Sequence, residues 1–117
     1  MGVNIIKEKS FDFALKIVSM YQLLVDEKRE FVLSKQLLRS DSSVGANIRE
    51  AEHAESKADF IHKMSISLKE ANESSYWIEL LFRSNYITEN QYKNINNDLT
   101  EILKLLTSII KTSKNKL

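Results

Sequence analysis

Glu50 and His53 are the residues of this 117-residue chain whose types and spacing come nearest to a metal site. A glutamate followed three residues later by a histidine places both side chains on one face of a helix, and di-iron bundles take ligands from this motif. Such a site needs the motif twice and two further glutamates. Here it occurs once, because His62 is preceded by Asp59 at the same spacing. We therefore predict no metal and no other cofactor.

Glu70 and Glu73 are a second pair that could do chemistry, as general acid and general base. Acid–base catalysis needs a pocket and two titrating groups in unlike environments. If the helices containing these residues and Arg39 pair in antiparallel fashion, the guanidinium lies opposite both carboxylates, and we interpret the three side chains as a structural ion pair. The chain offers no phosphate-binding glycine loop and no arguable serine, histidine and acid arrangement. We predict that it is not an enzyme and has no small-molecule substrate.

Basic side chains follow the middle of the chain and could contact phosphates. These residues are Lys35, Arg39, Arg49 and Lys63. Glutamates are interspersed among them, and the whole chain has 17 basic and 16 acidic residues, for a net charge of +1. Mixed charge of this kind is typical of a solvated, salt-bridged helix surface. Composition alone leaves both interpretations open.

The elements that position these residues are predicted to be helices. The chain contains no proline, no cysteine and two glycines, so tight β-turns are almost unavailable. Its length suits one domain, residues 1–117. The absence of cysteine fits a reducing compartment. The N-terminus resembles no secretory signal, and no apolar run reaches the ~20 residues of a membrane span. We expect a cytoplasmic protein without a membrane partner.

Two helices are predicted in the first half of the chain from apolar residues at intervals of three and four. The first follows a short lead, residues 1–9, and is capped by Ser10. Its core-facing residues are expected to be Phe11, Ala14, Ile17, Val18, Tyr21, Leu24 and Val25. The second spans residues 33–54, and its core-facing residues are Leu33, Leu37, Val44, Ile48 and Ala51.

Two further helices begin at capping boxes, in which two side chains accept hydrogen bonds from each other's backbone N–H groups. The boxes are Ser56 with Asp59, and Thr88 with Gln91. The third helix has the most regular core stripe, which is Phe60, Met64, Ser67, Ala71, Ser74, Ile78 and Leu81. The fourth has Tyr92, Ile95, Leu99, Ile102, Leu106 and Ile109, and it leads into a basic tail, residues 111–117. Four helices with short connections predict an all-α, antiparallel up-down four-helix bundle.

Apolar residues outside the core stripe widen the apolar surface of the third helix. They include Ile66, Trp77 and Leu80. A monomeric bundle needs one stripe per helix, so a second stripe suggests contact with an identical subunit. The alternative is a broad core face with Trp77 on its rim.

Gly45 lies in the middle of the second predicted helix, where glycine costs about 1 kcal/mol relative to alanine. Its neighbours in that helix are small, so another helix backbone could approach closely and recover this cost in dispersion energy. Asn47 could then satisfy a buried polar contact or fix the register between helices. The residues leave open whether the approaching helix belongs to the same chain or to a second subunit.

Several motifs occur in a fixed order between Leu33 and Leu81. They are Gln36 with Arg39, SVGANIREA at residues 43–51, Asp59 with Phe60, and KEANESSYW at residues 69–77. With these motifs the chain resembles the four-helix bundle family encoded by intervening sequences of bacterial 23S ribosomal RNA genes, also called S23 ribosomal proteins. The flanking helices agree in length and pattern, so the resemblance covers nearly the whole chain.

The resemblance implies a bundle that assembles as a ring-like homopentamer. It also implies a likeness to the accessory protein of diversity-generating retroelements, a similar pentamer whose basic surface engages nucleic acid and a reverse transcriptase. The basic positions that carry over are Arg39 and Arg49, with Lys35 and Lys63 as neighbours. Asp41 stands where the family more often has a small residue, and it adds a negative charge beside them.

Two functions are favoured by these observations. The first, implied by the resemblance, is a non-enzymatic homo-oligomeric bundle that binds or scaffolds RNA or a nucleoprotein. The second, favoured by the near-neutral charge, is a protein-interaction or structural assembly module without nucleic-acid contact. A metal-dependent enzyme built on Glu50 and His53 is a third hypothesis, which the single motif disfavours.

Overall fold

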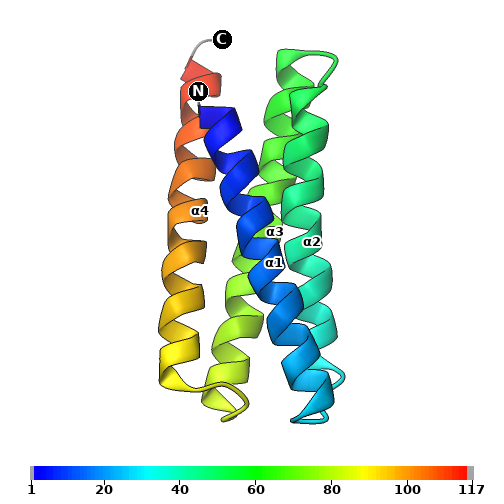
Figure 1. Ribbon diagram of the computed structural model, residues 1–117. Helices are drawn as coiled ribbons and strands as arrows, with labels where there is room; N and C mark the ends of the chain where they lie inside the picture. The colour runs from blue at the N-terminus through cyan, green and yellow to red at the C-terminus, as the bar shows by residue number, and fades with distance from the viewer. Residues whose placement is uncertain (1, 116–117) are drawn as a thin grey trace.

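The computed structural model of the chain describes residues 2–115 and consists over that range of four helices joined by short turns. These are α1 (Gly2–Asp26), α2 (Leu33–Glu52), α3 (Lys57–Arg83) and α4 (Glu89–Asn115). The helices run alternately up and down, each packs against the next, and α4 closes the bundle against α1 (Figure 1). The predicted antiparallel four-helix bundle is confirmed.

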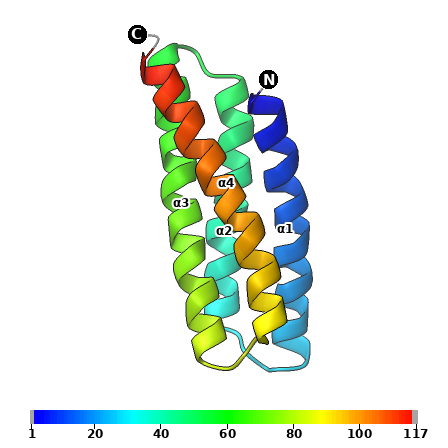
Figure 2. The same ribbon diagram turned by 90° about the vertical axis from the view of Figure 1, so that its left-hand side faces the viewer.

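The bundle is a rod 48 Å long, and its two ends differ in what they contain. One end holds the α1–α2 and α3–α4 turns. The other holds the α2–α3 turn together with the beginning of α1 and the end of α4 (Figures 1 and 2). The start of α3 and the end of α4 therefore lie at the same end of the molecule.

Three of the four helices bury the stripes that the sequence predicts. On α2 and α3 every predicted core residue is buried except the first of each stripe, Leu33 and Phe60, which are half-buried. On α4 the buried stripe ends at Ile110, and the adjacent Ile109 is half-buried. The repeat at intervals of three and four is enough here because each helix has one dominant apolar face.

Helix α1 buries a face that overlaps only in part with the predicted one, since Ile17 and Leu24 are buried as expected. Its buried residues are Ile6, Ser10, Phe13, Ile17, Met20 and Leu24. Phe11 and Val18, which we expected in the core, are 49% and 41% exposed. Two overlapping stripes in α1 both satisfy helical spacing, and the neighbouring helices α2 and α4 decide which of them is covered.

The two ends of the chain are more helical than the sequence suggested. The predicted lead is wrong for residues 2–9, because α1 begins at Gly2. Ser10 is not a cap but a buried residue inside the helix, where its hydroxyl donates to the Lys7 carbonyl at 3.0 Å. The predicted basic tail is helical over residues 111–115, and its last two residues, like Met1, lie outside the described residues.

Side-chain caps fix where α3 and α4 begin. The Asp59 N–H donates to the Ser56 hydroxyl at 3.0 Å. Thr88 and Gln91 exchange two bonds, of 2.7 and 3.1 Å, between each other's side chain and backbone N–H. The predicted box of Thr88 with Gln91 is therefore confirmed. At Ser56 only the cap is present, because the Asp59 carboxylate accepts from the Glu55 N–H rather than from that of Ser56.

Candidate nucleic-acid and subunit interfaces

Arg39 on α2 lies opposite Glu70 and Glu73 on α3. Its Nη1 is 3.7 Å from a Glu70 carboxylate oxygen, and its Nη2 bonds to Glu73. The Trp77 indole N–H donates to the same Glu73 oxygen at 3.1 Å. The Trp77 bond is the largest effect and lowers the pKa of Glu73. Burial opposes it, but the nearby Arg39 lowers the pKa further, so the net shift is downward. The predicted ion pair is confirmed, and it keeps Glu73 ionised rather than poised as an acid.

Lys63 on α3 forms the second ion pair across the same two helices. Its ammonium group is 3.0 Å from a carboxylate oxygen of Glu50, as antiparallel pairing predicts. This hydrogen bond raises the pKa of Lys63. Two of the four predicted phosphate contacts, Arg39 and Lys63, thus face carboxylates of their own chain. Within residues 2–115, Lys35 and Arg49 are exposed and have no carboxylate within 4.0 Å.

Arg49 instead stacks on an aromatic ring of α1. Its guanidinium carbon lies 5.1 Å from the centroid of the Phe11 ring, within the range of a cation–π interaction. Phe11 is half-exposed, so the pair forms part of the surface between α1 and α2. Both partners remain accessible to another molecule.

Glu50 and His53 do not form a metal site. The Glu50 carboxylate is engaged by Lys63, whereas the His53 side chain projects into solvent. Over the part of the chain that the structure describes, no group of three or more His, Cys, Asp or Glu side chains is arranged to hold a metal ion.

Gly45 does not receive the close helix approach that we expected, at least not from its own chain. A Cβ atom added to Gly45 would lie 3.9 Å from the Ser10 hydroxyl of α1, which is an ordinary van der Waals distance. Asn47 donates to the Ser43 carbonyl at 2.9 Å and to the Ser43 hydroxyl at 3.1 Å. It bonds within α2, so it does not fix the register between two helices.

The second apolar stripe of α3 is partly buried within the bundle. Trp77 packs against the core and is tied to Glu73, as a residue on the rim of a broad core face would be. Ile66 and Leu80 are half-buried, and the neighbouring Tyr76 is exposed, with its ring edge-to-face on Trp77. An apolar surface therefore remains on α3, but it is narrower than the sequence indicates.

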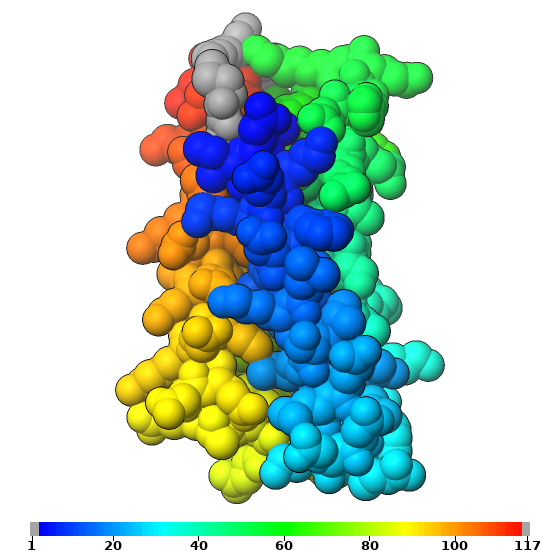
Figure 3. Space-filling model, in the orientation of Figure 1, coloured from blue at the N-terminus to red at the C-terminus, as the bar shows by residue number. Residues whose placement is uncertain are grey.

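An uncovered apolar surface lies on α1, and we did not identify it from the sequence. We call it the α1 outer face, and it consists of Phe11, Leu15 and Val18. Each side chain is between 41% and 54% exposed. Figure 3 looks onto α1, which runs down the middle of the view with α4 and α2 on either side. The sequence does contain a signal for this surface, because α1, like α3, has more apolar residues than one stripe requires.

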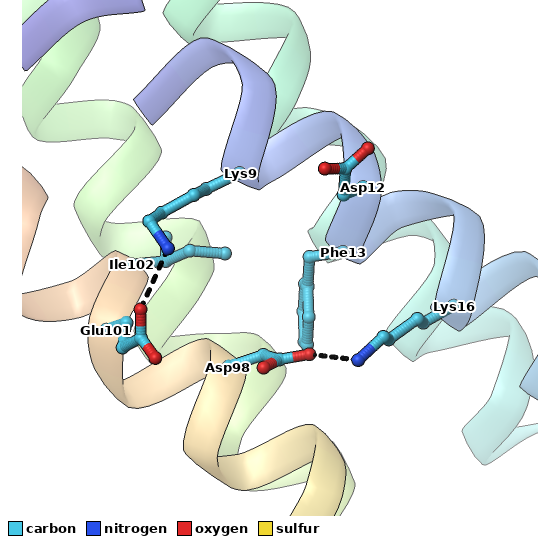
Figure 4. Close-up of a pocket in the computed structure, with 7 residues that line it drawn as sticks. All are labelled: Lys9, Asp12, Phe13, Lys16, Asp98, Glu101 and Ile102. Atoms are coloured by element: carbon cyan, nitrogen blue, oxygen red, sulfur yellow. Dashed lines mark hydrogen bonds and ion pairs between the residues drawn. The ribbon is translucent and has the colours of Figure 1, made fainter. Parts of the chain in front are cut away.

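Ion pairs between α1 and α4 line a cavity with a volume of about 270 Å³. Lys9 bonds to Glu101 at 2.9 Å and Lys16 to Asp98 at 2.5 Å, with Phe13 lying between the two pairs (Figure 4). The bond to Glu101 raises the pKa of Lys9, which keeps this group an ammonium ion. A lysine used as a nucleophile or general base needs the opposite shift. These pairs are suited to holding α1 against α4.

The comparison with known proteins assigns the family. The family model of the 23S rRNA-intervening sequence protein matches residues 3–108, which is most of the chain. The chain belongs to this family. The resemblance found in the sequence is therefore confirmed.

A solved structure from the same family agrees with the fold. It is a protein with unknown function from the S23 ribosomal protein family of Bacteroides thetaiotaomicron VPI-5482, determined at 1.70 Å resolution. It is 63% identical, with a TM-score of 0.93, and the match covers 95% of this chain and 99% of that one. No curated protein matches the chain significantly. Neither description names a reaction.

Asp41 gives this 23S rRNA-intervening sequence protein an unusual buried carboxyl group. It is 3% exposed on α2, and burial raises its pKa to about 7. Among the described residues, no hydrogen bond or ion pair engages its carboxylate. We expected Asp41 to add a negative charge beside the basic residues of α2. Its side chain is instead withdrawn from the surface, so it dilutes the surface charge less than its formal charge suggests.

None of the helices within residues 2–115 is both long enough and apolar enough to cross a membrane.

Proposed function

We propose that this 23S rRNA-intervening sequence protein is a non-enzymatic, homo-oligomeric helical scaffold that binds RNA or a nucleoprotein in the cytoplasm. The observation that carries the proposal is the α1 outer face, where Phe11, Leu15 and Val18 follow one another at intervals of four and three. Contiguous exposed apolar residues on a soluble domain mark a surface that another molecule covers.

A second copy of the chain is the occupant that we propose for this surface. Two apolar surfaces of the described residues are unlike each other, the α1 outer face and the narrower surface of Ile66, Tyr76 and Leu80 on α3. Contact between unlike surfaces is heterologous, and heterologous contacts close into rings when the rotation between subunits permits. Five subunits is the number that the family resemblance implies.

RNA is the second partner that we propose, and the family description supports it. Lys35 and Arg49 are the members of the predicted basic row that remain exposed without a carboxylate within 4.0 Å in residues 2–115. Arg39 and Lys63 contribute less, because Glu50, Glu70 and Glu73 already neutralise them.

A protein-interaction module without nucleic-acid contact is the second candidate. The net charge of +1 and the ion pairs along the α2–α3 surface favour it. Salt dependence separates the two candidates, because binding through phosphate contacts weakens steeply as the salt concentration rises.

The experiment is light scattering of the purified protein, with and without an RNA hairpin, at low and high salt. We expect an oligomeric mass that becomes monomeric in the double variant L15E/V18E. The matched control N97E/T100E adds the same charges at exposed positions of α4 and should keep the oligomeric mass. A monomeric wild type contradicts the assembly, and an oligomer that gains no RNA mass at low salt favours the protein-interaction module.

A further inference from the structure

We propose that the RNA phosphates bind on a face of the molecule that the predicted basic row does not include. We call it the lysine face, and it consists of Lys104, Lys111 and Lys114 on α4, with Lys57 at the start of α3. This inference rests on the proposed RNA-binding function and names the surface that performs it. All four side chains are exposed.

The spacing of the three α4 lysines places them on one side of the helix. Lys111 follows Lys104 by seven residues, which is close to two turns, and Lys114 follows by three more. At 1.5 Å per residue the three lysines span about 15 Å of the helix axis. A nucleic-acid duplex carries one phosphate charge about every 1.7 Å of its axis, so several phosphates lie within reach of such a row.

The lysine face contains no competing carboxylate on α4. The last acidic residue of that helix is Glu101, which is bonded to Lys9 on the α1 side. In the described range, none of Lys104, Lys111 and Lys114 has a carboxylate within 4.0 Å. Arg39 and Lys63 on the α2–α3 surface lack this property, because each is paired within the chain.

A groove between α3 and α4 adjoins the lysine face, and Lys111 and Lys114 line it. Leu68 of α3 and Ile110 of α4 supply apolar surface, and Thr107, Lys111, Lys114 and Asn115 supply the polar lining. The groove volume is about 260 Å³. Hydroxyl, amide and ammonium donors are the groups that contact phosphate and sugar oxygens, while an apolar floor suits the ribose carbons.

Lys57 extends the lysine face to the adjoining helix. It is the first residue of α3, and the start of α3 lies at the same end of the bundle as the end of α4 (Figures 1 and 2). The nearest acidic residue in α3, Asp59, accepts from the Glu55 N–H and lines a different depression, shared with Arg49 and Lys63 on the α2 side. It therefore belongs to the opposite side of α3.

The helix C-terminus by itself does not account for these lysines. Cations near the end of a helix interact favourably with its dipole, but this effect falls off within the last turn. Helix α4 ends at Asn115, so Lys114 lies in the last turn, whereas Lys111 and Lys104 lie before it. A row that continues beyond the reach of the dipole fits a polyanionic partner better.

The test compares two triple variants of equal charge for binding to a fluorescein-labelled RNA hairpin at several salt concentrations. K104Q/K111Q/K114Q removes the lysine face, and K28Q/R29Q/K93Q removes three exposed cations at the other end of the bundle. We expect the first variant to lose affinity about tenfold or more and to release about three fewer counterions, while the second stays within about twofold of wild type. Circular dichroism and light scattering check that each variant keeps its helices and mass.

Each other outcome contradicts a defined part of the proposal. Wild-type protein that binds no RNA at low salt contradicts the RNA-binding function itself. Unchanged binding by K104Q/K111Q/K114Q, or equal loss in both variants, leaves that function standing and overturns the lysine face as its site. If the lysine face instead binds vesicles of phosphatidylserine while RNA does not compete, the partner is a lipid surface and the inference is wrong.

Discussion

The Ser67 hydroxyl on α3 donates a 2.6 Å hydrogen bond to the backbone carbonyl of Val44 on α2. Ser67 is fully buried, and one turn further along α3 comes Ala71, followed by Ser74, whose hydroxyl lies 2.8 Å from that of Ser40. Small residues let α2 and α3 pack closely, while their hydroxyls satisfy one another and the backbone. The α2–α3 contact is thus held by polar groups inside an otherwise apolar core.

We predict that Ser67→Ala destabilises the fold by about 1 kcal/mol, because it removes one buried hydrogen bond. Ser67→Val should cost about 1–3 kcal/mol more, since the larger side chain must push α2 and α3 apart. Urea unfolding at a fixed protein concentration measures both. The exposed Ser108→Ala is the control. Equal stabilities for the two Ser67 variants would show that α2 and α3 are not closely packed at this position, which contradicts the prediction.

Glu30 is predicted to stabilise the start of α2. Its carboxylate accepts from the backbone N–H groups of Val32, Leu33 and Ser34 at 2.7–3.1 Å. Burial raises the pKa of Glu30, but these backbone donors outweigh it and lower the pKa overall. Glu30→Gln should therefore cost about 1–2 kcal/mol at neutral pH, as loss of a helix cap does.

The pH dependence of this effect has a definite sign. Because the folded-state pKa of Glu30 lies below the ordinary value of 4.5, its stabilisation is present above that value and is lost as pH falls through the folded-state pKa. The stability difference between wild type and Glu30→Gln should therefore shrink in acid. A difference that stays constant from neutral pH to pH 3 would contradict a charged cap.

Asp41 is predicted to destabilise the fold at neutral pH. Its pKa is about 7 in the folded chain against an ordinary 3.8, so the folded state binds more protons between these values. Stability should fall as pH rises through this window. Asp41→Asn should match wild type near pH 4 and exceed it above pH 7 by roughly 1–4 kcal/mol. Urea unfolding across this pH range measures the free energies of unfolding of both proteins, with the exposed Asp12→Asn as the control. A difference between wild type and Asp41→Asn that does not change with pH would contradict the buried-carboxyl explanation.

Gly45→Ala is predicted to stabilise the fold by about 0.5–1 kcal/mol, because alanine is the better helix former. The added Cβ meets only the Ser10 hydroxyl, at 3.9 Å. Ala46→Gly, at the exposed neighbouring position, should destabilise by a similar amount and serves as the mirror-image control. Thermal unfolding tests both. If Gly45→Ala instead lowers the melting temperature or the oligomeric mass, a helix of a second subunit approaches Gly45.

Local patterns in the sequence were sufficient to predict much of the fold. The absence of proline, the scarcity of glycine, the helix caps at Ser56 and Thr88 and the regular stripe from Phe60 to Leu81 predicted four antiparallel helices and the starts of α3 and α4. They did not predict that α1 begins at Gly2. The same register predicted that Arg39 meets Glu70 and Glu73 and that Lys63 meets Glu50. These features depend on residues within one helix or on one helix pair, so spacing along the chain specifies them.

Other features were decided by the tertiary structure. Spacing could not choose between the two stripes of α1, because covering Phe13 and exposing Phe11 depends on where α2 and α4 pack. It could not reveal the Glu30 cap either, since that carboxylate reaches α2 through a turn of irregular backbone. The lysine face also joins residues from the start of α3 and the end of α4 that lie far apart in the sequence. Helical periodicity is a local property, whereas burial and the pairing of charges depend on which helices become neighbours.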